Sequence, residues 1–116
     1  MHELSIVFEV VDSLEKLAKE NNIHKIVGLT MEIGEVSTVI PDYFRDCFEW
    51  AKEKHELIKD CKLDIVVLEA ISYCKDCKET FSTTKYGKEC PHCHKDNTYL
   101  ITGDELNIRD IKVLDE

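Results

Sequence analysis

The chain has 116 residues and a mass of 13.5 kDa, which is about the length of one ordinary domain. Its 24 acidic and 15 basic residues give a formal net charge of −9, which disfavours nucleic-acid binding because such binding depends on neutralising phosphates. No apolar run approaches the ~20 residues of a membrane-spanning helix, and the start of the chain lacks a secretory signal, so we expect a cytoplasmic protein with no membrane partner.

The first half of the chain predicts helix, strand and helix. Apolar residues at helical spacing predict a helix over residues 4–20, which Asn21-Asn22 ends. Alternating apolar residues over 25–33 then predict a strand with one buried face, and Gly34 ends that strand. Pro41 suits the first turn of a second helix, because proline there gives up no helical hydrogen bond.

The second half predicts strands. Residues 63–71 are almost continuously apolar and predict one strand. Residues 99–102 and 105–113 predict two strands joined as a hairpin by a Gly103-Asp104 turn. A change in the parity of the apolar residues indicates a β-bulge near Arg109-Asp110. The predicted fold class is therefore α+β, with two helices packed on a small mixed β-sheet.

The segment 73–98 is nearly empty of aliphatic residues, so it cannot order itself by apolar burial. It contains Cys74-Lys-Asp-Cys77 and, after twelve further residues, Cys90-Pro-His-Cys93. Two such pairs typically hold one zinc ion in a ribbon-like module. Disulfides are rare in a reducing compartment, and a redox Cys-x-x-Cys motif would rarely occur twice. The spacing predicts a structural zinc whose four thiolates close the coordination shell.

Other polar and sulfur-containing residues give weaker signals. His92 lies within the last cysteine pair and His94 directly follows it, and either could replace a thiolate, although solvent-facing positions on a zinc knuckle are commoner. Cys47 and Cys61 are interpreted as small buried hydrophobic residues. The zinc segment itself carries five lysines against four acids, and four thiolates with Zn²⁺ bring it to about −1, which offers no basic face to nucleic acid.

Four motifs follow one another along the chain: Met1-His2-Glu3, Ile33-Gly34, the two cysteine pairs and Gly103-Asp-Glu-Leu-x-Ile. Together and in this order they resemble the HypA/HybF family of nickel metallochaperones of hydrogenase maturation. The resemblance implies a nickel-binding α/β domain, formed by residues 1–72 and 99–116, with a zinc-ribbon-like domain at 73–98 inserted between two strands. It also implies that His2 binds nickel and that zinc is held by Cys74, Cys77, Cys90 and Cys93. The sequence departs from the family at His94, where a small residue such as Gly is expected.

The first atoms of the chain make chemical sense as the nickel site that the resemblance implies. The Met1 amine, the backbone nitrogens that follow it and the His2 imidazole can form consecutive chelate rings in one plane. Planar nitrogen coordination suits Ni(II) or Cu(II) and suits Zn(II) poorly. Glu3 is expected to contribute through its backbone or its carboxylate, and Glu35 and Asp42 are further candidates.

The sequence therefore predicts a non-enzymatic nickel carrier that delivers Ni(II) to the precursor of the hydrogenase large subunit. The family suggests a GTPase accessory protein as a partner, and the absence of a phosphate-binding loop motif leaves nucleotide hydrolysis to that partner. The alternative is a zinc-ribbon scaffold that only mediates protein contacts, in which His2 binds no metal. An enzyme ranks third, since no catalytic constellation stands out. The chain is expected to be a monomer or a homodimer.

Overall fold

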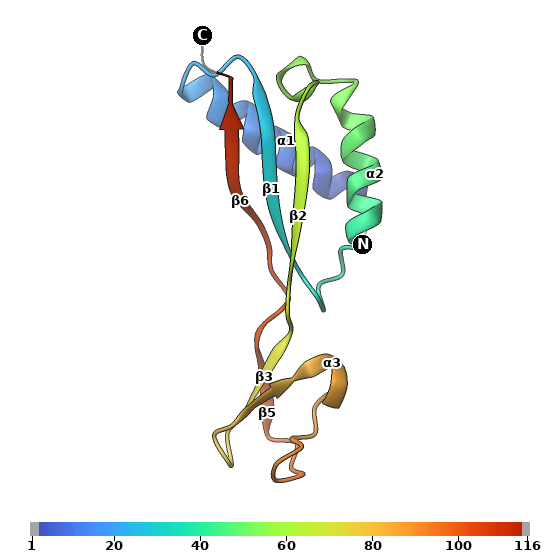
Figure 1. Cartoon of the computed structure of the whole chain (residues 1–116), viewed down its shortest axis with the longest axis vertical. Helices are drawn as coiled ribbons and strands as arrows, with labels where there is room; N and C mark the ends of the chain where they lie inside the picture. Colours follow the sequence, from blue (N-terminus) through green and yellow to red (C-terminus); the bar gives the residue numbers. More distant parts are fainter. Residues whose placement is uncertain (1–2, 115–116) are drawn as a thin grey trace. The chain divides into compact units, whose positions relative to one another are not determined.

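The computed structural model describes residues 3–114, and its elements form two three-stranded sheets and three α-helices (Figure 1), which confirms the α+β class. In the described part of the chain, no helix is both long and apolar enough to cross a membrane. The elements in chain order are α1 (Glu3–Glu20), β1 (Ile26–Gly34), α2 (Pro41–Lys52), the 3₁₀-helix η1 (Glu56–Ile58), β2 (Lys62–Leu68), β3 (Ile71–Cys74), β4 (Thr80–Ser82), α3 (Thr83–Tyr86), β5 (Thr98–Thr102) and β6 (Leu106–Val113).

The chain divides into two compact units. The first unit comprises the described residues up to Glu32, Val39–Val66 and the described residues from Asn107 on, and the second comprises Ile33–Thr38 and Val67–Leu106. One sheet has the strand order β2-β1-β6, and the other has the order β4-β3-β5.

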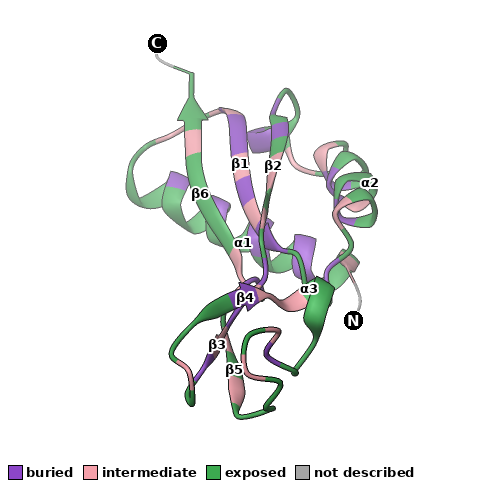
Figure 2. Ribbon diagram, turned by 60° about the horizontal axis from the view of Figure 1, so that its bottom comes forward, coloured by how far each residue is buried: buried purple, intermediate pink, exposed green. Residues whose placement is uncertain are grey.

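The first unit is built as the apolar spacing predicts. The predicted helices are confirmed as α1 and α2, and α2 begins at Pro41. Both helices alternate buried and exposed positions around their axes (Figure 2), and α2 buries Phe44, Phe48 and Ala51. The predicted inner face of β1 is buried at Leu29 and Met31 in this unit and at Ile33, where the second unit begins. The core of this unit thus consists of aliphatic and aromatic side chains from one strand face and two helix stripes.

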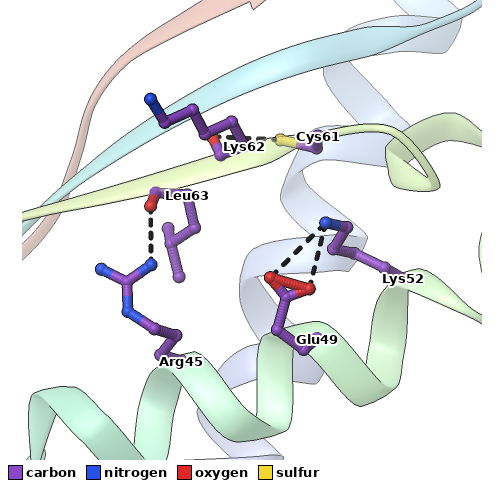
Figure 3. Close-up of polar contacts among 6 residues, drawn as sticks. All are labelled: Arg45, Glu49, Lys52, Cys61, Lys62 and Leu63. Atoms are coloured by element: carbon purple, nitrogen blue, oxygen red, sulfur yellow. Dashed lines mark hydrogen bonds and ion pairs between the residues drawn. The ribbon is translucent and has the colours of Figure 1, made fainter.

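Figure 3 shows one polar contact between α2 and β2 and one ion pair within α2. Arg45 Nη1 donates a hydrogen bond of 2.8 Å to the Leu63 carbonyl, and Lys52 Nζ lies 3.0 Å from a carboxylate oxygen of Glu49. Cys61 is fully buried, as expected, whereas Cys47 is only partly buried. Burial raises the pKa of the Cys61 thiol to about 11, so this thiol stays protonated and inert.

The prediction of one strand over residues 63–71 is wrong, because β2 and β3 belong to different sheets. The division occurs at Ala70, which is fully buried and whose N–H donates to the Glu35 carboxylate at 3.1 Å instead of to a strand partner. In the second unit, β3 is the central strand and pairs antiparallel with β4 and β5, with a register shift between Ile71 and Ser72.

The predicted hairpin at Gly103-Asp104 is also wrong, because β5 and β6 lie in different sheets. The Glu105 carboxylate accepts hydrogen bonds from the Gly103 N–H at 2.7 Å and the Thr102 hydroxyl at 2.6 Å. Gly103 has a φ of +120° and packs on Ala70, where an added Cβ would lie 2.4 Å from the Ala70 Cα. Only glycine fits this close backbone approach. The bulge near 109–110 stays a prediction.

Candidate metal centre

The second unit brings the four predicted zinc ligands together. Cys74 ends β3 and Cys77 lies in the turn that follows, while the other pair lies in the loop between α3 and β5. The Sγ atoms of Cys74 and Cys93 are 3.6 Å apart, those of Cys77 and Cys90 are 3.5 Å apart, and all four ligand atoms lie within 4.8 Å of one another. Zn–S bonds of about 2.3 Å in a tetrahedron place sulfur atoms ~3.8 Å apart. The cysteines are free, and their arrangement fits zinc.

The two cysteine pairs form the same turn. The Lys78 N–H donates to the Cys74 carbonyl at 2.9 Å, and the His94 N–H donates to the Cys90 carbonyl at 2.8 Å. Lys78 and His94 both have positive φ, at 64° and 62°. The left-handed backbone is the physical reason for expecting a small residue at position 94. The same reason applies to Lys78, which the sequence reasoning missed, and the signal is the position directly after each Cys-x-x-Cys pair.

The thiols of the cluster do not share one ionisation state without a cation. Backbone hydrogen bonding, first of all from Cys77, lowers the pKa of the Cys74 thiol to about 7. Burial raises the pKa of the Cys77 thiol to about 12. A divalent cation offsets the repulsion of crowded thiolates and deprotonates them on binding. Metal binding at neutral pH therefore releases the protons that thiols with a raised pKa still hold.

The cysteine cluster takes the place of an apolar core in this part of the chain. Between residues 73 and 98 the only buried side chains are Cys74, Phe81 and Cys90. The Phe81 ring meets Tyr86 edge-on with centroids 6.3 Å apart, and the rest of the segment is exposed or half-buried (Figure 2). His92 and His94 are exposed, and the structure groups only the four cysteines as ligands among the described residues. The centre is thus a structural zinc site.

The predicted nickel ligands Met1 and His2 lie outside the described residues. Glu3 is the first residue of α1, and its carboxylate accepts a hydrogen bond of 3.1 Å from the N–H of Ile40, the residue that precedes α2. Sequence reasoning gave no signal for this contact. It engages the Glu3 carboxylate, one of the two groups through which the sequence predicts that Glu3 binds nickel.

The two further candidates, Glu35 and Asp42, belong to different units. The Glu35 carboxylate accepts the hydrogen bond from Ala70 within the second unit. Asp42 is exposed in the first turn of α2. Among the described residues, neither belongs to a group of three or more side chains with metal-binding geometry.

Comparison with known proteins gives consistent matches. A family model described as hydrogenase/urease nickel incorporation, metallochaperone, hypA matches residues 1–113. The chain is 35% identical to the hydrogenase/urease maturation factor HypA of Helicobacter pylori over the whole of both chains. It is 32% identical to the hydrogenase maturation factor HybF of Salmonella typhimurium, with 97% of this chain and 99% of the other covered.

Solved structures are similar as well. The solution structure of the Ni metallochaperone HypA from Helicobacter pylori has a TM-score of 0.73 and 33% identity, with all of both chains covered. A second solution structure, of a HypA protein, has a TM-score of 0.75 and 35% identity, with all of this chain and 98% of the other covered.

Proposed function

The chain belongs to the HypA family of hydrogenase/urease nickel metallochaperones, and on this premise we propose that it binds Ni(II) through the Met1 amine, the His2 imidazole and the backbone of Glu3. As a member of the family it is a nickel metallochaperone of hydrogenase maturation, which is a different role from that of a zinc scaffold alone. The observation that carries the nickel site is that the family match begins at residue 1 and so includes the Met1-His2-Glu3 motif.

The proposed site can exchange its metal because of its place in the chain. The hydrogen bond from Ile40 to Glu3 attaches the third residue to the start of α2, whereas the ligands of the first two residues precede the apolar stripe of α1. Nickel can then pass to a recipient one ligand at a time, without disturbing the core of the first unit. Amine, imidazole and amide nitrogens in one plane provide the strong field that Ni(II) accepts.

The remaining assignments follow the same proposal. Residues 1–72 and 99–116 form the nickel-binding domain, and residues 73–98 form the zinc-binding domain. The partners are a GTPase accessory protein and the precursor of the hydrogenase large subunit, and the place of action is the cytoplasm. The chain is a carrier and not an enzyme, since four cysteines fill the zinc shell and leave no open position for catalysis.

Nickel titration by calorimetry tests the site. His2→Ala and a variant with one extra residue before Met1 should each bind Ni(II) about tenfold or more weakly, a loss of about 1.4 kcal/mol or more. His24→Ala, which removes an exposed histidine elsewhere in the first unit, is the matched control and should bind normally. Titration in buffers of different ionisation enthalpy should reveal proton release. Unchanged affinity in both altered proteins contradicts the proposal and directs attention to His92 and His94.

A further inference from the structure

Exposed aromatic side chains gather on the outer side of α1 and α2. The rings of Phe8 and Trp50 are in contact across the two helices, with centroids 6.0 Å apart, and they are 40% and 46% exposed. Leu4 lies one turn before Phe8 on α1, and Tyr43, which is 61% exposed, lies two turns before Trp50 on α2. We call Leu4, Phe8, Tyr43 and Trp50 the helical patch. Contiguous exposed apolar surface of this kind marks an interaction site.

The margin of the helical patch is acidic. The basic residues Arg45 and Lys52 contact Leu63 and Glu49 on the side of α2 shown in Figure 3. The Lys54 ammonium lies over the patch, with Nζ 5.4 Å from the centre of the Trp50 ring. Asp12 on α1, Asp42 and Asp46 on α2 and Glu53 directly after α2 are exposed carboxylates, and none of these four forms an ion pair within residues 3–114. The margin therefore carries an excess of negative charge.

The patch begins beside the proposed nickel site. Leu4 directly follows Glu3, and Phe8 lies about 6 Å beyond Leu4 along the axis of α1, given a rise of about 1.5 Å per residue. A protein seated on the patch therefore lies within reach of the amino terminus, where nickel enters and leaves in the proposed function.

We propose that the helical patch is the docking surface for the GTPase accessory protein, as the partner that exchanges nickel with this chain. This partner presents an apolar segment flanked by Lys and Arg side chains. The inference rests on the proposed function. Trp50 and Tyr43 are the anchors, because large aromatic side chains carry most of the energy of such contacts. The carboxylates select the partner by its charge and speed its approach.

A second copy of this chain suits the patch poorly. A symmetric dimer would place the same patch on both sides of the interface, so that each acidic margin faced its like. Like charges set against one another disfavour a complex, whereas a basic margin complements all four carboxylates.

Binding of the purified GTPase accessory protein of hydrogenase maturation from the same organism, measured by calorimetry, tests the proposal. Trp50→Ala should weaken binding about 30-fold, and Tyr43→Ala should weaken it by tenfold or more, on the scale of interface anchors. Ile108→Ala is the matched control, because Ile108 is 38% exposed and belongs to β6 of the same unit. It should leave binding unchanged.

A charge reversal tests the acidic margin separately. Asp46→Lys should slow association and reduce its dependence on salt, whereas Glu20→Lys, at the far end of α1, should change neither. Both anchors are largely exposed, so these variants should keep the fold, and their melting temperatures verify this.

Nickel titration separates this proposal from the proposed function. Trp50→Ala should bind nickel normally, and His2→Ala should still dock. Unchanged nickel affinity in His2→Ala and in the extended protein, with docking intact, would refute the terminal site alone. The docking proposal is overturned if the unmodified chain fails to bind the GTPase, or if Trp50→Ala and Tyr43→Ala bind as tightly as Ile108→Ala. It is also overturned if Trp50→Ala abolishes a dimer of this chain, because a second copy then occupies the patch.

Discussion

Replacing Cys90 with Ser, or removing the metal with a chelator, should unfold residues 73–98 and leave the first unit folded. A structural zinc in a small module contributes an apparent ~10–16 kcal/mol to folding at neutral pH. Against this, Phe81 is the one large apolar side chain that the segment buries, and its burial stabilises by about 1.5–3 kcal/mol. The free energy contributed by zinc binding is several times larger than that from burying Phe81, so the segment cannot keep its structure without the metal ion.

The first unit has its own core, so it should survive the loss of zinc. Val7, Leu14, Leu29, Phe44 and Phe48 are all at most 1% exposed and belong to that unit. Hydrogen exchange measured by NMR reports, residue by residue, whether residues 73–98 unfold and whether the first unit stays folded.

In the folded protein the Cys74 N–H donates to the Glu79 carbonyl, and the Lys78 N–H donates to the Cys74 carbonyl. Without zinc, both N–H groups should exchange rapidly. The helical N–H groups of α1 and α2 should keep their protection. Cys61→Ser is the matched control, because Cys61 is as fully buried as Cys90 but lies in the first unit. This variant should keep a zinc content of one ion per chain. Full protection of the Cys74 and Lys78 amides without zinc would refute the reasoning.

Three further predictions concern the zinc turn, the acid response and charge. His94→Gly should relieve roughly 1 kcal/mol of left-handed backbone strain and tighten zinc binding about fivefold in a chelator competition, with His92→Gly as a control that brings no gain. Hydrogen bonds from Thr102 and the backbone lower the pKa of Glu105, so this carboxylate stabilises the fold above the usual glutamate pKa of about 4.3, and the contribution is lost as the pH falls through its folded pKa. Glu105→Gln should therefore flatten the dependence of the melting temperature on pH between about 5 and 3, and an unchanged slope would contradict this. Fluorescence anisotropy with labelled DNA and RNA should detect no binding at micromolar protein in physiological salt, since the chain carries a net charge of −9.

The elements that sequence reasoning predicts correctly are those whose burial follows one local period. The stripes of α1 and α2 and the inner face of β1 are of this kind. The zinc ligands are equally visible, because metal coordination constrains the spacing of each cysteine pair locally. The resemblance adds the nickel role of His2, which lies outside the described residues and stays a proposal.

The two wrong predictions, the single strand over 63–71 and the hairpin at Gly103-Asp104, concern places where residues distant in sequence determine the path of the backbone. The apolar run through residues 63–71 hides a division at Ala70, which is made by Glu35, a residue 35 positions earlier. The Gly103-Asp104 pair has the composition of a hairpin turn, but the Glu105 carboxylate and the contact with Ala70 direct the chain elsewhere. A glycine-acid pair alone does not distinguish these two cases.

The close approach of Ala70 and Gly103 also bears on how such a protein can evolve. The segment 71–102 starts and ends at neighbouring backbone atoms, since a β-carbon on Gly103 would lie 2.4 Å from the Ala70 Cα. Adjacent ends are the condition under which a whole segment can be gained, lengthened or exchanged without stretching the chain on either side. The zinc-bearing segment can therefore diversify as a cassette in related proteins, while the residues at its two ends, a small alanine and an obligatory glycine, have little freedom to change.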